Sequence, residues 1–145
     1  MKTLTNKIIL TLGAAMLTFS TLSAEKIGEI KTSGMIFKDK LEILAFNDPG
    51  IKGVTCYVTS PKKSLSFEDP TDASISCRKT GEIKGVMRSG KRIFKNSKGL
   101  FVKSLYVDRI YDAKRKVLVY VSYTSKLSGT NANNSISVVR IRKGM

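Results

Sequence analysis

The chain of 145 residues contains no histidine and only two cysteines. Without histidine it lacks the usual general base of enzymes and the commonest metal ligand of proteins, which disfavours hydrolase and zinc chemistry. The sequence also has no phosphate-binding glycine loop and no serine-nucleophile motif. We therefore predict a protein that is not an enzyme and that uses no cofactor and no metal.

Long apolar runs are also missing, and the N-terminal 24 residues have instead the features of a secretory signal peptide. Lys2 and Lys7 precede a mainly apolar stretch at residues 8–19, and Ala24 is a small residue before a charged pair. The stretch is shorter than the roughly 18 residues that suggest a spanning helix. Glu25 stands where a lipoprotein would need its lipid-accepting cysteine. We expect export to the periplasm of one domain, residues 25–145, with no membrane span and no lipid anchor.

The cysteines, Cys56 and Cys77, are expected to form a disulfide, because an isolated pair in an exported chain favours a crosslink over a metal site or a reactive thiol. Each lies on the apolar face of a segment with period-two alternation, at residues 54–59 and 73–78. We expect the disulfide to be buried and to tie two strands together across the core. On the chain-entropy model it should stabilise the fold by about 3 kcal/mol.

Alternation and β-branched residues predict strands throughout this domain. Segments 100–111 and 117–123 are apolar on both faces and are joined by a charged connection, which indicates a central hairpin. Residues 47–50 indicate a turn, whereas signals for single helical turns at 69–72 and 83–88 are weak. We predict a mainly β fold: a small antiparallel β-sandwich or barrel of seven to eight strands with one disulfide and at most one or two short helical turns. The remaining predicted strands are 26–30, 35–37, 41–46 and 136–141.

Positive charge is concentrated in the second half of the chain, whose overall net charge is +15. Residues 25–77 hold seven basic and eight acidic residues, a net of −1, whereas residues 78–145 hold 17 basic and three acidic residues, a net of +14. This indicates a basic surface and an anionic partner, either an envelope component or an acidic protein. Export disfavours nucleic acid. The alternative is that the charge serves only solubility. The candidate anion-binding residues are Arg88, Lys91, Arg92, Lys95, Lys98 and Lys103.

Two other groups of residues have competing interpretations. Glu68, Asp69 and Asp72 could bind calcium, but their spacing matches no EF-hand, and turn or cap chemistry explains them more simply. Asp108 and Arg109, with Tyr111, could line the pocket of a small-molecule enzyme, or they could form cross-strand pairs. A further alternative function is that of a structural or stress-related protein with a specific protein partner.

Several segments resemble the CreA family of bacterial periplasmic proteins. They are residues 46–49, 54–58 and 72–78 and, above all, Phe101-Val102-Lys103-Ser104-Leu105 with residues 111–115. The resemblance runs from about residue 27 to residue 139. The family label refers to catabolite regulation and reflects a genetic setting, and the resemblance supplies no reaction, ligand or catalytic residue. Family members usually have a longer, glycine-rich connection between the cysteines than residues 60–67 provide here, and a proline-containing apolar C-terminal end.

Overall fold

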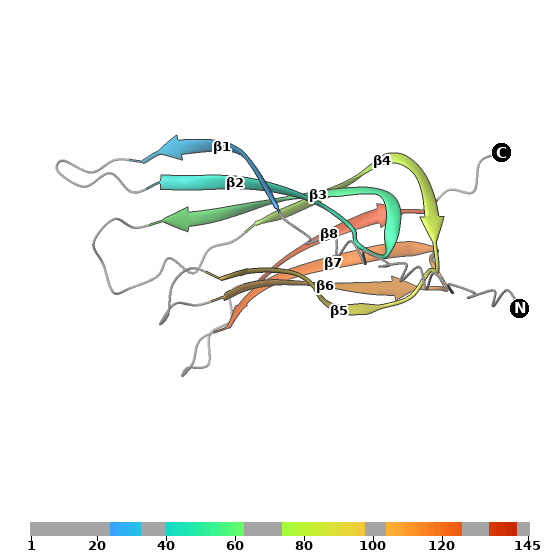
Figure 1. Ribbon diagram of the computed structural model, residues 1–145. Coiled ribbons are helices and arrows are strands. Elements are labelled where there is room, and N and C mark those ends of the chain that lie inside the picture. The colour runs from blue at the N-terminus through green and yellow to red at the C-terminus, as the bar shows by residue number, and fades with distance from the viewer. Residues whose placement is uncertain (1–23, 33–39, 63–73, 98–103, 126–133, 142–145) are drawn as a thin grey trace, which may run out of the picture.

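The computed structural model describes residues 24–32, 40–62, 74–97, 104–125 and 134–141 (Figure 1). These residues form eight strands and no helix, arranged as two stacked four-stranded sheets, so the predicted β-sandwich is confirmed. The first sheet has the order β1-β2-β3-β4 and the second β5-β6-β7-β8, and all neighbours are antiparallel. The strands are β1 (Glu25–Lys31), β2 (Lys40–Asn47), β3 (Ile51–Lys62), β4 (Ile75–Gly85), β5 (Gly90–Ser97), β6 (Ser104–Asp112), β7 (Val117–Ser125) and β8 (Asn134–Arg140).

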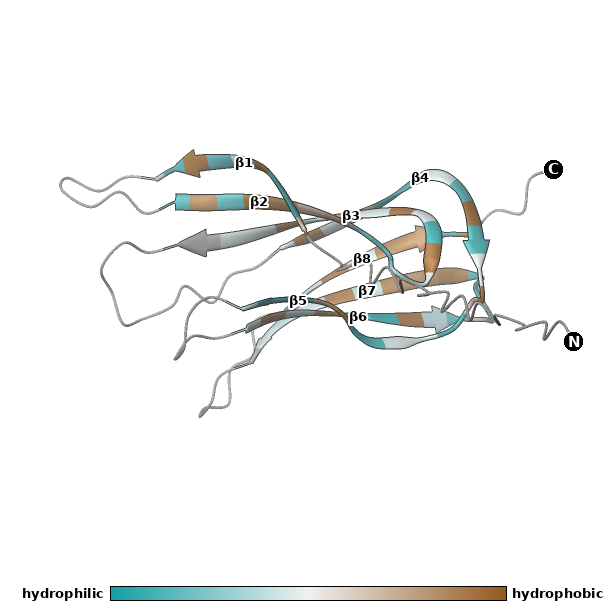
Figure 2. Cartoon of the chain, in the orientation of Figure 1, coloured by the Kyte–Doolittle hydropathy of each residue, from teal (hydrophilic) through white to brown (hydrophobic). Residues whose placement is uncertain are grey.

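The core lies between the two sheets and is built by the period-two alternation seen in the sequence. In β3, Val54, Cys56 and Val58 are buried, while the intervening side chains face outward. Phe46 of β2 stacks on Phe94 of β5 with ring centroids 4.3 Å apart, which joins the first sheet to the second. Figure 2 shows the hydrophobic segments distributed over strands of both sheets. One apolar cluster therefore serves the whole sandwich.

The predicted hairpin is confirmed: β6 and β7 are the central strands of the second sheet and pair over their full length. The sequence interpretation missed β5, because lysine and arginine interrupt its alternation and its register shifts between Gly90 and Phe94. The helical turn considered at 83–88 is wrong. Residues 83–85 belong to β4, and Gly85 has a φ of +130°, a conformation that favours glycine and is not helical.

Other expectations fall on parts of the chain that the structure does not describe. These are the strand at 35–37, the helical turn at 69–72 and almost all of the signal peptide, residues 1–23. In the described ranges, no helix is long and apolar enough to cross a membrane.

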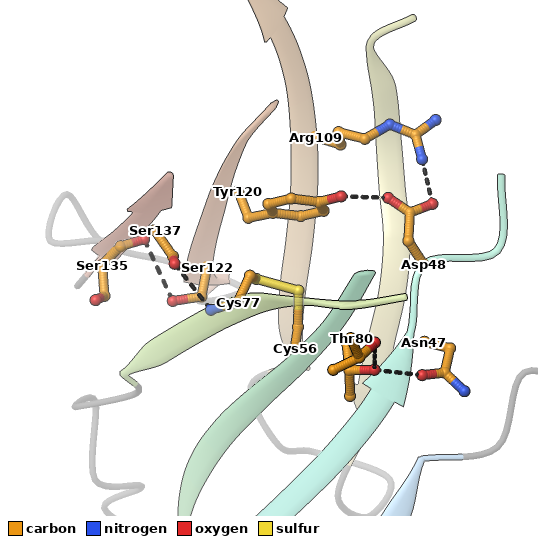
Figure 3. Close-up of a disulfide and its surroundings, with 11 residues drawn as sticks. Asn47, Asp48, Cys56, Cys77, Thr80, Arg109, Tyr120, Ser122, Ser135 and Ser137 are labelled. Carbon is orange, nitrogen blue, oxygen red and sulfur yellow. Dashed lines mark hydrogen bonds and ion pairs between the residues drawn. A yellow bond between two sulfur atoms is a disulfide. The ribbon is translucent and has the colours of Figure 1, made fainter. Parts of the chain in front are cut away.

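The disulfide joins Cys56 of β3 to Cys77 of β4 and is buried, as expected. The expectation that it spans the core is wrong, because the two cysteines lie directly opposite each other on neighbouring strands of the same sheet. A hydrogen bond, and not the disulfide, connects the second sheet to Cys77. The Cys77 amide donates a hydrogen bond of 2.8 Å to the Ser137 hydroxyl of β8 (Figure 3).

Candidate functional site

A carboxylate is buried where β2 turns into β3. Asp48 follows the last residue of β2, and its side chain is fully buried. Its Oδ1 atom accepts hydrogen bonds from the amides of Gly50 at 2.9 Å and Ile51 at 3.0 Å. An aspartate that binds the amides following it is a common way of closing a turn, so the turn predicted at 47–50 is confirmed.

The same carboxylate binds two side chains of the second sheet (Figure 3). Arg109 of β6, whose side chain is 3% exposed, forms an ion pair and a hydrogen bond with Oδ1. The buried hydroxyl of Tyr120 on β7 donates to Oδ2 at 2.7 Å. Burial, followed by the hydrogen bond to Asp48, raises the pKa of the Tyr120 phenol far above its usual range, so that the phenol remains a proton donor. We call Asp48, Arg109 and Tyr120 the buried triad.

The surroundings of Arg109 leave little space at the buried triad. Its Nε donates to the carbonyl of Arg88 at 2.9 Å, which fixes the connection between β4 and β5. A Cβ atom on Gly50 or Gly90 would lie 3.1 or 3.2 Å from Nη2 of Arg109. The guanidinium thus lies between Gly50 and Gly90, where the absence of a side chain leaves room for it. This arrangement holds the turn at 47–50 and the β4–β5 connection against the second sheet.

A second polar cluster lies on the outer face of the second sheet, around Tyr106. Leu105 and Val107 are buried, so alternation directs Tyr106 to the outer face, together with Lys95, its partner on β5. The Arg92 guanidinium carbon lies 4.9 Å and the Lys95 Nζ atom 5.8 Å from the centroid of the Tyr106 ring. Both distances are in the range of cation–π attraction.

Asp108 fixes the position of Arg92. Its Oδ1 atom accepts a hydrogen bond of 2.7 Å from the Arg92 amide and one of 3.2 Å from the Tyr123 hydroxyl. Arg92 has a φ of 49°, an uncommon left-handed conformation for a non-glycine residue, and this bond helps to hold it. Burial and the charge of Asp108 raise the pKa of Tyr123. We call these five residues, Arg92, Lys95, Tyr106, Asp108 and Tyr123, the Arg92 cluster.

The structure brings together only part of the predicted anion-binding set. Arg92 and Lys95 both lie over the Tyr106 ring. Arg88, in the connection between β4 and β5, and Lys91, near the start of β5, are exposed residues that precede them in the chain. Lys98 and Lys103 lie outside the described residues. The basic half of the chain does not form one face, because its first members belong to β4 of the first sheet. They are Arg78, Lys79 and Lys84.

The residues considered for an enzyme pocket are not gathered in one place. Asp108 faces outward and Arg109 inward, as neighbouring residues of a strand must. Sequence reasoning missed the buried triad, because the partners of Asp48 are 61 and 72 residues away and nothing local identifies them. The tyrosine pair of the Arg92 cluster has only a weak signal: both tyrosines lie in the two segments predicted to form the hairpin, but their pairing, Tyr106 opposite Tyr123, depends on the register that the structure shows.

A shallow depression of about 340 Å³ lies on the other sheet. Glu25 and Ile27 of β1, Asn47 of β2, and Thr55 and Tyr57 of β3 are among the residues that line it. The Thr55 hydroxyl donates to the Asn47 side-chain oxygen at 2.7 Å. No residue of the Arg92 cluster lines this depression, so the two features are separate.

The fold and its surface define an all-β sandwich protein with an intrasheet disulfide and a cation–tyrosine cluster on one outer face. Residues 27–144 match the family model described as CreA protein, and the chain belongs to the CreA family. It is 40% identical over 132 residues to Protein CreA of three Escherichia coli strains, covering 81% of this chain and 84% of each relative. The resemblance noted in the sequence is thereby confirmed. No solved structure gives a significant match.

Proposed function

We propose that this chain is an exported, non-enzymatic binding protein that holds an anionic component of the bacterial envelope on its basic surface. The observation that carries the proposal is the placement of Arg92 and Lys95 over the Tyr106 ring. Export is supported by the signal-peptide features of residues 1–24 and by the disulfide, which suits an oxidising compartment.

The geometry of the Arg92 cluster suits an anion. A guanidinium that lies over an aromatic ring can still donate N–H groups to the oxygens of a phosphate or carboxylate. Lys95 adds a second positive charge on the same ring. Because Asp108 holds the Arg92 backbone in place, less conformational freedom remains to be lost when a ligand binds.

A non-enzymatic role is supported by the chemistry of the side chains. The sequence has no histidine, and the buried Arg109 is committed to Asp48 and to a backbone carbonyl. Of the residues considered for a pocket, Asp108 serves Arg92 and Tyr123.

The proposal is tested by titrating the protein with fluorescent polyphosphate and measuring anisotropy at about 50 and about 300 mM salt. The double variant Arg92→Gln/Lys95→Gln should bind at least about tenfold more weakly at low salt, because it loses two charge contacts. The matched control Lys52→Gln/Arg78→Gln removes one lysine and one arginine from the first sheet and should bind nearly as the parent does. Equal losses in the two double variants would mean that only net charge matters and would refute a site at the Arg92 cluster.

A further inference from the structure

The outer face of the second sheet carries a group of aliphatic side chains at its centre. Outward-facing side chains of β6, β7 and β8 stand side by side in cross-strand rows. One row is Ile110, Val119 and Val138, and the next contains Val121 and Ile136 beside Asp108. Ile110, Ile136 and Val138 are 50%, 63% and 55% exposed. Five branched aliphatic side chains thus form one contiguous patch, in which Val119 and Val121 are half-buried and the other three are exposed, a feature that marks an interaction surface.

Positive charge borders this patch at both ends. At one end the next row is Tyr106, Tyr123 and Asn134, with Arg92 and Lys95 over Tyr106. At the other end the row is Asp112, Val117 and Arg140. Asp112 pairs with Arg115 at 2.8 Å, and the turn between β6 and β7 exposes three consecutive cations, which outnumber this one carboxylate. They are Lys114, Arg115 and Lys116.

We infer that this face docks onto a membrane surface that contains anionic lipids, an inference that rests on the proposed function and names its partner. An apolar centre fits acyl chains, and a cationic border fits anionic headgroups. Tyrosines at the border suit the boundary between the two, because the ring is apolar and the hydroxyl polar. A second copy of the chain is a poor occupant, since pairing two such faces would bring Arg92, Lys95 and Arg140 close to their like-charged equivalents.

The experiment measures cosedimentation with vesicles of phosphatidylcholine alone and with vesicles containing roughly 30% phosphatidylglycerol, at about 50 and about 300 mM salt. The parent and every variant are expressed from the full sequence beginning at Met1. Each is purified in the form that accumulates in the cell, so that all of them have the same N-terminus. We expect binding to the anionic vesicles only. Part of this binding should survive the higher salt, because apolar burial is not screened.

The variant Ile136→Thr/Val138→Thr isolates the apolar patch, since threonine keeps the β-branched shape that strands favour. It should weaken vesicle binding about tenfold at the higher salt and leave polyphosphate binding unchanged. The matched control is Val86→Thr, which alters a valine that is 72% exposed between β4 and β5. It should bind as the parent does.

The outcomes separate this inference from the proposed function. Vesicle binding that Ile136→Thr/Val138→Thr does not weaken, or equal binding to both kinds of vesicle, would overturn the inference. Polyphosphate binding that still depends on Arg92 and Lys95 would then leave the proposed function standing with a soluble polyanion as ligand. Near-ultraviolet circular dichroism checks that each variant is folded, and Ile110→Thr provides a second test of the patch on another strand.

Discussion

The two sheets differ in how they are held and in what they present to solvent. The first contains the disulfide, and its outer face carries hydroxyl contacts, such as those of Thr55 with Asn47 and Thr80. The Cys56–Cys77 disulfide does not reach the second sheet. The outer face of that sheet carries a group of aliphatic side chains with basic residues at its border. The covalent bond therefore stabilises one layer but does not join the layers. Joining them depends on the shared core, on the buried triad and on the hydrogen bond from the Cys77 amide to Ser137.

Breaking the buried triad should have the largest effect. Asp48→Ala leaves Arg109 buried without its countercharge and the amides of Gly50 and Ile51 without their acceptor. We expect the free energy of unfolding to fall by about 3–5 kcal/mol in urea denaturation. Tyr120→Phe removes a single donor and should cost about 2 kcal/mol. If Asp48→Ala lowered the free energy of unfolding less than Tyr120→Phe does, the buried triad would not be an important link between the sheets.

Removing the crosslink should have a smaller effect. Cys56→Ala/Cys77→Ala opens a link between residues 21 positions apart, which on the chain-entropy model lowers the free energy of unfolding by about 3 kcal/mol. The variant should remain folded, because the core and the triad still join the sheets. Urea denaturation and near-ultraviolet circular dichroism test both points, and the parent protein in reducing agent is the control. Separation of the sheets on reduction would contradict the division of roles described above.

An exposed ion-pair network gives the smallest expected effect. Glu29 on β1 contacts Lys26 at 2.6 Å and Lys40 at 2.9 Å, and these bonds lower its pKa from 4.5 to about 2. A lowered folded pKa stabilises the fold above pH 4.5, and this contribution is lost as the pH falls toward 2. Screening by solvent keeps it small. NMR titration of the Glu29 carboxyl should give a low pKa in the parent and a higher one in Lys26→Gln, and an unchanged value would show that the contact does not persist in solution.

The sequence predicts the layers of this fold better than its connections. Alternation was sufficient for β3 and for the start of β4, and apolar, valine- and tyrosine-rich segments were sufficient for the β6–β7 hairpin. It failed for β5, where the residues that build the Arg92 cluster also interrupt the pattern. The cysteines predicted a disulfide but not its position within one sheet, which depends on strand order. The same alternation does exclude a pocket shared by the neighbours Asp108 and Arg109, whereas the pairing of Asp48 with Arg109 requires the assembled sandwich.

In each sheet every strand pairs with its neighbour along the chain, so each sheet consists of successive hairpins. Such contacts are local and form without long loop closures. The partners of Asp48 are 61 and 72 residues away, and these contacts require both sheets to be in place. The contacts of Asp48 with Arg109 and Tyr120 are therefore expected to form after the folding transition state. Tyr120→Phe removes only the long-range bond to Asp48 and leaves the local turn bonds of Gly50 and Ile51 in place, so it should mainly accelerate unfolding and leave the folding rate nearly unchanged; this contact is then a determinant of the lifetime of the folded protein.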